Sequence, residues 1–155
     1  MGVKRELAGE VVVQTLRTAN AMVRASRRLF RPYGLSEAQF NVLNVLATPL
    51  HAAGLTQREL SDILVVDRSN VTGLLDRMEE AGWVRREAVP GDRRAWRVRM
   101  TASGRRLWEA CEPAYAREVR RAMASIGRER LQTTLDVLRA LERSAIGLGD
   151  AERGD

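Results

Sequence analysis

Residues 55–87 read LTQRELSDILVVDRSNVTGLLDRMEEAGWVRRE, a stretch that predicts two short helices separated by a tight turn. The first helix starts at the capping box TQRE (56–59), in which the Thr hydroxyl and the Glu carboxylate each accept a hydrogen bond from a free backbone amide. Asp67 or Ser69 can cap the second helix, and Gly82 lies at its C-cap position. Two short helices joined by a tight turn predict a helix-turn-helix.

The second of these helices has two chemically distinct faces. One face has the i, i+3, i+4, i+7 spacing of buried residues, with Val71, Leu74, Leu75 and Met78. The other carries side chains that suit contacts with bases and phosphates: Arg68, Ser69, Asn70, Thr72, Gly73, Asp76 and Arg77. Because the second helix of a helix-turn-helix enters the major groove, this pattern predicts double-stranded DNA as a partner.

A β-hairpin is predicted directly after the second helix. Strands over 83–87 and 95–100 flank the turn residues Pro90-Gly91-Asp92, and apolar residues alternate with arginine along the second strand. Asp92 can accept backbone amides in the turn, hold an arginine side chain in one orientation, or serve as a plain turn residue. A helix-turn-helix followed by a two-stranded ribbon is the winged-helix arrangement.

Positive charge is concentrated on and around this hairpin. Residues 85–106 hold eight arginines against Glu87 and Asp92, a local charge of +6 that equals the net charge of the whole chain. The narrow minor groove attracts arginine through its negative potential, and the flat guanidinium can enter it. The charge therefore indicates an anionic partner for the hairpin, with a merely solvated face as the alternative interpretation.

The segment before the helix-turn-helix holds one more helix and a loop. Pro32 and Gly34 end the first helix of the chain, and Ser36 caps the next one. Its inward residues are Phe40, Leu43 and Leu46 or Ala47. The dipeptide Thr48-Pro49 stops this helix, and PLHAAGL (49–55) is then predicted as a loop.

Long amphipathic helices are predicted at both ends of the chain. Over 7–31 an apolar seam follows helical spacing at Val12, Leu16, Ala19, Val23, Ser26 and Phe30. Thr101 caps a helix to about Ile126 that Pro113 should kink. A last helix after Gly127 carries Leu131, Leu135, Leu138 and Leu141, before the tail GLGDAERGD frays. One winged-helix domain has too few neighbours to bury these faces, so a second copy of the chain is expected to cover them.

Taken together, these motifs resemble the multiple-antibiotic-resistance regulator (MarR) family of winged-helix repressors. The resemblance covers nearly the whole chain and is most specific in 55–87, in the wing signature Asp-x-Arg-x-x-x-Val formed by Asp92, Arg94 and Val98, and in MTASG (100–104). It implies a mainly α fold with a small β-hairpin wing, in which a homodimer contacts DNA through the second helix of the helix-turn-helix and the wing.

The implied domain organisation is a single MarR-type domain over 1–155. Residues 35–103 would form the winged helix-turn-helix DNA-binding lobe, and 5–34 and 104–147 would form dimerisation helices. The polar face and the resemblance together predict DNA contacts from Arg68, Ser69, Asn70, Thr72, Gly73, Arg77, Arg93 and Arg94, with Asp92 orienting the wing. Gly73 departs from the family, because many members carry a base-contacting arginine there, but a glycine would let the backbone approach DNA closely.

The resemblance also implies a small-molecule pocket where the first, second and fifth helices meet the DNA-binding lobe. The residues expected there, for a small aromatic or phenolic effector, are Phe30, Tyr33, Phe40, Trp108, Cys111 and Tyr115. The alternative is that this spacing of aromatic and sulfur side chains marks core residues. Redox sensing through Cys111 is a weaker hypothesis, because peroxide-sensing relatives usually place the reactive cysteine in the first helix, where this chain has none.

Other classes of protein fit the sequence poorly. No nucleophile is paired with a base and no phosphate-binding glycine loop follows a strand, so we expect no enzyme. His51 and Cys111 are too few for a four-coordinate metal, so no metal or cofactor is expected and His51 is predicted to be a solvated loop residue. A single cysteine, a start (MGVKRE) without a secretory signal, and no apolar run of about 18 residues predict a cytoplasmic protein without a membrane anchor.

The sequence thus predicts a sequence-specific transcriptional regulator, a ligand-responsive repressor that binds an inverted repeat as a homodimer. Half-sites would lie roughly 34 to 36 Å apart, one turn of DNA, or a multiple of that distance. The alternatives are a non-specific nucleoid-type DNA-binding protein and a winged-helix protein-interaction module. The basic wing fits specific and non-specific DNA binding alike, because phosphate contacts carry no sequence information.

Overall fold

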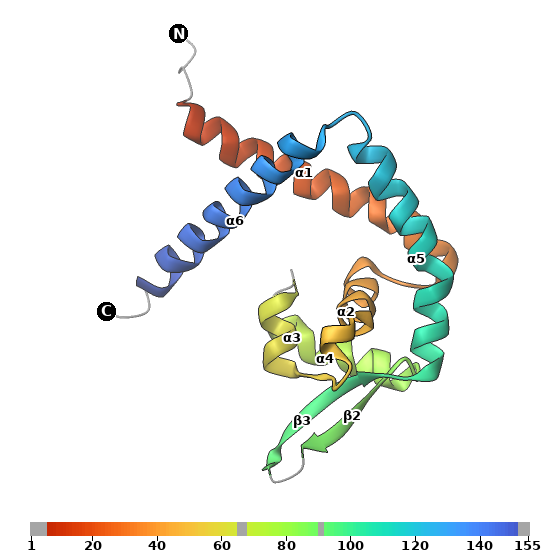
Figure 1. Ribbon diagram of the computed structural model, residues 1–155. Helices are drawn as coiled ribbons and strands as arrows, with labels where there is room; N and C mark the ends of the chain where they lie inside the picture. Colours follow the sequence, from red (N-terminus) through yellow and green to blue (C-terminus); the bar gives the residue numbers. More distant parts are fainter. Residues whose placement is uncertain (1–5, 65–67, 90–91, 152–155) are drawn as a thin grey trace. The chain divides into compact units, whose positions relative to one another are not determined.

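The computed structural model describes the backbone of residues 6–64, 68–89 and 92–151, and the side chains of 6–64, 70–89 and 96–145. The described chain forms six α-helices and a small three-stranded antiparallel sheet (Figure 1). It divides into two compact units, residues 1–115 and 116–155. The predicted fold class, mainly helical with a small winged hairpin, is confirmed.

The first unit begins with two helices joined by a tight turn. Helix α1 (Leu7–Phe30) is followed by a 3-10 turn and by Gly34, whose φ of 68° lies in the left-handed region that favours glycine. Helix α2 (Glu37–Ala47) starts at the predicted N-cap, Ser36, whose hydroxyl accepts the Gln39 amide at 3.2 Å. The side chain of Gln39 in turn accepts the Ser36 amide at 2.8 Å, which completes a capping box.

The helix-turn-helix consists of α3 (Gln57–Ile63) and α4 (Arg68–Glu80). The capping box at the start of α3 is confirmed. The hydrogen bonds from Thr56 lower the pKa of the Glu59 carboxyl. The cap is therefore intact at neutral pH, and its contribution to stability is lost as the pH falls through the folded pKa of Glu59. Ser69 lies inside α4, so its prediction as the cap was wrong, while Asp67 lies outside the described residues.

Helix α4 ends as the glycine signal predicts. Gly82 has a φ of 72°, and its amide donates to the Glu79 carbonyl at 2.9 Å. The Trp83 amide donates to the Met78 carbonyl at 2.9 Å, which completes a Schellman motif. This cap directs the chain out of α4 into the first strand of the wing.

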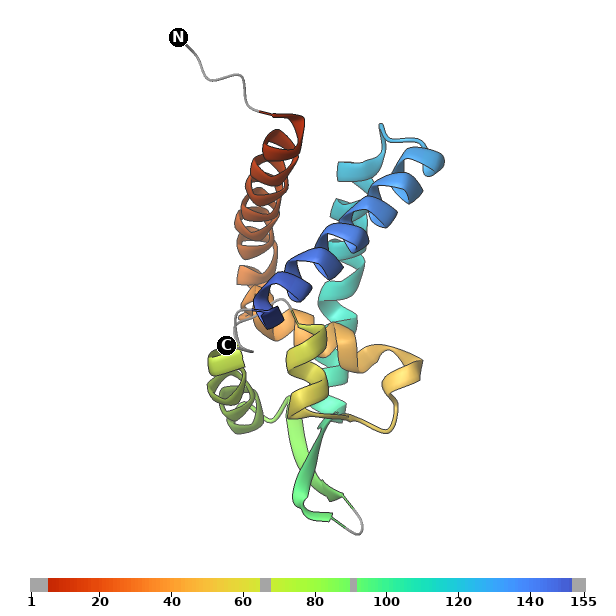
Figure 2. The same ribbon diagram turned by 90° about the vertical axis from the view of Figure 1, so that its left-hand side faces the viewer.

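The wing is the hairpin of β2 (Val84–Val89) and β3 (Asp92–Met100), and it projects beyond α2, α3 and α4 in both views (Figures 1 and 2). A two-residue strand, β1 (Leu55–Thr56), pairs with β3 opposite Val98 and Arg97, which gives the order β1-β3-β2. The prediction of a plain loop over 49–55 was therefore wrong. The segment holds a 3-10 turn (Pro49–His51) and ends in a strand too short to show any periodicity.

Two helices complete the chain, α5 (Ala102–Met123) and α6 (Arg128–Ala151). The predicted N-cap of α5 is confirmed, because the Thr101 hydroxyl accepts the Gly104 amide at 3.0 Å. Helix α5 continues through Pro113 and ends before Ile126, and the kink remains a prediction. Helix α6 extends to Ala151, into the tail that we expected to fray, because Gly147 and Gly149 cost only about 1 kcal/mol each and do not break a helix.

The core lies within residues 1–115 and joins the end of α1 to α2, α3, α4, the sheet and the start of α5. The predicted buried face of α4 is confirmed, because all four of its apolar residues are inside. The largest fully buried side chains are Phe30, Phe40, Leu43, Leu60, Leu75, Met78, Val42, Val71, Val84, Val98 and Cys111. This burial fixes the orientation of α4 and so determines which of its residues face solvent.

Candidate nucleic-acid interface

The solvent face of α4 carries the polar side chains predicted from the sequence. Asn70, Thr72 and Arg77 are exposed, and Gly73 lies between them in the same helix. Among the described side chains, a Cβ at Gly73 would meet the end of Arg77 alone, at 3.4 Å, so the described structure leaves the backbone open here. Arg68 begins α4, but its side chain and that of Ser69 lie outside the described residues.

One of these residues is held by the preceding helix. The Gln57 side chain donates from Nε2 to Oγ1 of Thr72 at 2.6 Å, across the turn of the helix-turn-helix. Gln57 is the first residue of α3 and is half-buried, whereas Thr72 is exposed. A residue of α3 therefore fixes the position of the Thr72 hydroxyl on the solvent face of α4.

A second set of contacts ties α4 to the wing. Arg86 of β2 donates to Asp76 at 2.6 Å and to Glu79 at 2.5 Å through its guanidinium, and its backbone amide donates to Glu79 at 2.8 Å. Burial alone would lower the pKa of Arg86, but the hydrogen bonds to both carboxylates and their negative charge raise it. Asp76, which the sequence placed on the DNA-facing side, is thus bound to the wing.

Arg86→Met should lower the free energy of unfolding by about 1 to 2 kcal/mol, because it removes the half-buried guanidinium that binds both the Asp76 and the Glu79 carboxylates. The matched control is Arg85→Met in the same strand. Arg85 is 60% exposed and, among the described residues, pairs with Glu87 at 2.6 Å, so we expect a loss of less than about 0.5 kcal/mol. Urea unfolding of both variants measures the difference, and equal losses would contradict the role of Arg86.

Further arginines of the hairpin also contact the protein itself. Arg97 donates to the carbonyl of Gly54 at 2.8 Å, and Arg99 donates to Glu87 and to the carbonyl of Ala52, both at 3.2 Å. These contacts join β3 to the segment before α3. Much of the local positive charge therefore supports the fold, and the arginines predicted to contact DNA, Arg93 and Arg94, begin β3 with side chains outside the described residues.

The six residues predicted for an effector pocket lie together in and around the core. Phe30 and Phe40 stack with ring centroids 4.2 Å apart, and Tyr115 lies 4.8 Å from Phe40. Trp108 donates from Nε1 to the side-chain carbonyl of Asn44 at 3.2 Å. Phe30, Phe40 and Cys111 are fully buried, whereas Tyr33, Trp108 and Tyr115 are half-buried and pack against them.

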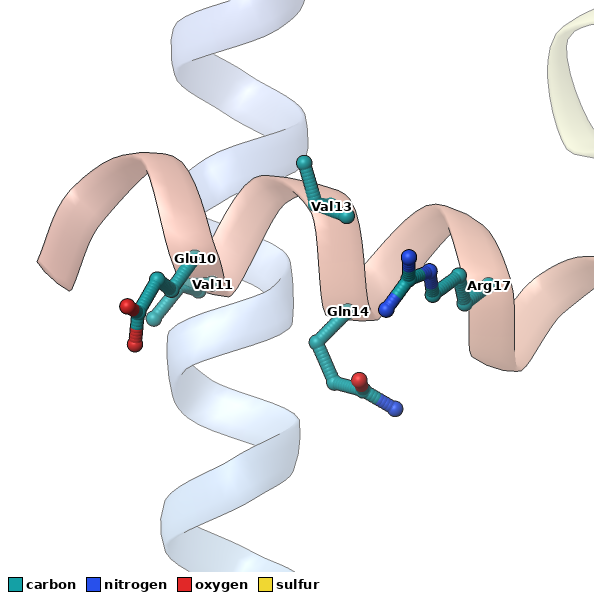
Figure 3. Close-up of a pocket in the computed structure, with 5 residues that line it drawn as sticks. All are labelled: Glu10, Val11, Val13, Gln14 and Arg17. Carbon is teal, nitrogen blue, oxygen red and sulfur yellow. The ribbon is translucent and has the colours of Figure 1, made fainter. Parts of the chain in front are cut away.

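Two hollows lie elsewhere in the first unit. One, of about 460 Å³, lies beside α1 and is lined there by Glu10, Val11, Val13, Gln14 and Arg17 (Figure 3). The other, of about 650 Å³, lies at the junction of α1 and α2 and is lined by Arg27, Arg31 and residues 34–39. None of the six predicted effector residues lines either hollow.

Cys111 should react with thiol reagents roughly a hundredfold or more slowly in the folded protein than in the unfolded chain. Burial raises the pKa of its thiol, nearby Glu112 adds to the rise, and the thiol donates to the Trp108 carbonyl at 3.4 Å. Because the thiol ionises more readily when unfolded, its contribution to stability is present at neutral pH and is lost as pH rises through the folded pKa. Alkylation rates with and without urea measure the difference in reactivity, and fast labelling of the native protein would support the redox-sensing hypothesis.

The prediction that His51 is a solvated loop residue was wrong. His51 is half-buried in the 3-10 turn, and its Nδ1–H donates to the Val45 carbonyl at 2.8 Å.

Within the described part of the chain, no group of three or more His, Cys, Asp or Glu side chains is suited to hold a metal ion. Among the described residues, no helix has the length and apolar character needed to cross a bilayer.

Sequence reasoning missed Gln57, Glu79 and Arg86 as parts of this surface. Gln57 had a usable signal, because the capping box places it at the first position of α3, next to the turn. No sequence signal pointed to Glu79 and Arg86, because their pairing depends on the direction in which β2 continues after the Schellman motif. Both are ordinary charged residues in a region rich in charge.

The sequence and fold of this chain are similar to those of known transcriptional regulators. The family model described as MarR family matches residues 33–95. The transcriptional activatory protein BadR of Rhodopseudomonas palustris is 38% identical over 106 residues, which cover 68% of this chain and 61% of BadR. The first curated relatives are matched over 61%, 57% and 54% of their own lengths, less than two thirds in each case.

Solved structures extend the likeness over most of the chain. The regulator MosR of Mycobacterium tuberculosis, solved in complex with DNA, is 29% identical with a TM-score of 0.70, over 86% of this chain and 96% of MosR. CouR of Rhodococcus jostii, solved with p-coumaroyl-CoA, is 28% identical with a TM-score of 0.77, over 89% of this chain and 95% of CouR. The likeness therefore includes the helices outside the helix-turn-helix.

Proposed function

The chain belongs to the MarR family of winged-helix transcriptional regulators, which are not enzymes, and from this membership we propose that it binds operator DNA in the cytoplasm as a regulator. The observation that carries the proposal is α4, whose apolar face is buried while Asn70, Thr72 and Arg77 face solvent. The DNA contacts would come from Arg68, Ser69, Asn70, Thr72, Gly73, Arg77, Arg93 and Arg94, with Asp92 orienting the wing. The regulator MosR, solved with DNA, supports this assignment.

We propose that the chain acts as a homodimer on an inverted repeat. In α1, Leu7 and Leu16 are 75% and 60% exposed, and in α6 Leu135 and Leu138 are both 42% exposed. Apolar side chains that line a long helix in this way support a partner surface. In this proposal 5–34 and 104–147 form the dimerisation helices and 35–103 forms the DNA-binding lobe.

The same proposal makes the protein a repressor that releases DNA when a small aromatic or phenolic molecule binds. CouR was solved with p-coumaroyl-CoA, and this relative supports an aromatic effector. In this proposal the half-buried Tyr33, Trp108 and Tyr115 contact the ligand. They pack against the buried core, which includes Phe30, Phe40 and Cys111. An effector acts only by binding the DNA-incompetent arrangement more tightly than the competent one.

A salt series of binding isotherms tests this function. It compares DNA from directly upstream of the protein's own gene with a scrambled duplex, for wild type, Arg94→Ala and the control Arg28→Ala on α1. We expect the upstream DNA to bind about a thousandfold more tightly at physiological salt. The logarithm of affinity should fall with the logarithm of salt at a slope of roughly −0.9 per neutralised phosphate, and Arg94→Ala should reduce both affinity and slope while Arg28→Ala changes neither.

Other outcomes identify the alternatives. Equal binding of both duplexes, with the same steep salt dependence, indicates a nucleoid-type protein that coats DNA. No binding of either duplex at low salt indicates that the wing serves a protein partner. Adding diverse phenols and aromatic acids to the bound complex then tests the effector, and an affinity unchanged by all of them contradicts ligand release.

A further inference from the structure

We propose that Gln57 is a positioning residue that sets the base preference of Thr72, and that together they favour thymine in the major groove. The inference rests on the proposed reading of DNA by α4. Gln57 itself was not among the predicted DNA contacts. It belongs to α3, yet its Nε2 donates to Thr72 Oγ1 at 2.6 Å on the exposed side of the helix-turn-helix.

The hydrogen bond determines how the Thr72 side chain is held. A threonine in a helix divides between two χ1 rotamers, because its hydroxyl can also bond the carbonyl one turn earlier. A donor from α3 selects the rotamer that brings Oγ1 toward Gln57. The capping box is separate from this contact, because it uses Thr56 and Glu59, so Gln57 is replaceable without loss of the cap.

The direction of the hydrogen bond determines which base suits the pair. Because the Gln57 amide donates to Oγ1, the side of the hydroxyl that faces α3 is already used as an acceptor. The groups then favoured for contact with DNA are the hydroxyl hydrogen, strengthened by the bond that Oγ1 accepts, and the methyl group, because a base donor has only the second lone pair of Oγ1 left to bind. Thymine offers the matching O4 acceptor and 5-methyl group in the major groove, whereas adenine N6 and cytosine N4 are donors and need an acceptor.

Selection from random duplexes followed by binding isotherms tests the inference. Wild type, Gln57→Ala, Thr72→Val and the double variant are each measured with all four base pairs at every position of the selected site. Thr72→Val keeps the shape and the methyl group and removes the hydroxyl. The matched control is Gln14→Ala on α1, which removes a similar glutamine-to-threonine hydrogen bond, from Gln14 Nε2 to Thr18 at 3.3 Å, outside the lobe.

We expect wild type to prefer thymine at one symmetric position of each half-site, and Gln57→Ala and Thr72→Val each to weaken that preference by about tenfold. The double variant should lose no more than either single variant, because both changes break one contact. Gln14→Ala should keep the wild-type preference. Thermal unfolding shows whether each variant is folded, and a purely structural role of Gln57 would leave the base preference of the folded protein unchanged.

Four results overturn the inference. Gln57→Ala with wild-type preference at every position shows that Gln57 does not act on DNA reading, while the proposed function stands. Additive effects in the double variant, or a preferred base other than thymine where Thr72→Val acts, refute the coupling and its chemistry. A wild type that selects no sequence at all refutes the proposed function and this inference together.

Discussion

Gly104→Ala should lower the free energy of unfolding by about 3 kcal/mol, the upper end of the usual cost of overpacking. A Cβ at Gly104 would lie 2.1 Å from the carbonyl oxygen of Trp83 and 3.0 Å from Cγ of Met100. The closer of these atoms belongs to the backbone and cannot rotate away. The Thr101 hydroxyl accepts the Gly104 amide at 3.0 Å and donates to the Gly82 carbonyl at 2.6 Å, so the start of α5 is held against the end of α4.

The control for this prediction is Gly9→Ala in α1, where a Cβ would meet no atom of the described residues within 4 Å. This change should raise stability by about 0.5 to 1 kcal/mol, because alanine favours the helix over glycine. Urea unfolding of the two variants gives effects of opposite sign if α5 starts in close contact with Trp83. A stabilising effect at both positions would show that the contact is absent in solution.

Local chemistry was readable from the sequence. The capping box of α3, the Ser36 and Thr101 N-caps and the glycine at the end of α4 each depend on residues within four positions of one another, and the structure confirms them. The buried face of α4 was readable for a similar reason, because a period of 3.6 residues needs no knowledge of the partner surface.

Contacts between distant residues were not readable. Arg97 and Gly54 are 43 positions apart, and Arg99 and Ala52 are 47 apart. A hairpin has the same basic composition whether its arginines bind DNA, a carboxylate or a backbone carbonyl. Sequence reasoning therefore identified the surface correctly as basic and could not say which arginines are used inside the protein.

The wrong predictions share this origin. His51 is polar and follows a proline in a connecting segment, which is typical of a solvated loop, but the Val45 carbonyl at the end of α2 accepts its Nδ1–H. β1 is a strand only because β3 supplies its partners. In both cases the tertiary neighbour decides the structure and leaves no pattern in the segment itself.

Phe40→Ala should lower the free energy of unfolding by about 3 to 5 kcal/mol, the cost of replacing a buried phenylalanine by alanine. Phe40 is 0% exposed and is packed against Phe30 and Tyr115. The loss would be a large part of the roughly 5 to 15 kcal/mol that stabilises a typical domain. The control is Trp96→Ala, an aromatic residue on the wing that is 52% exposed, for which we expect a loss of less than about 1 kcal/mol.

This measurement also decides between the two interpretations of the aromatic cluster. If Phe40 is core, truncation removes packed neighbours and leaves an apolar cavity, which a small aromatic compound such as benzene can enter and partly restore stability. If Phe40 instead lines an open effector pocket, its ring already borders space, and the loss should stay near that of Trp96→Ala. The closeness of the Phe30 and Phe40 rings, 4.2 Å between centroids, leads us to expect the first result, with effector contacts confined to the half-buried Tyr33, Trp108 and Tyr115.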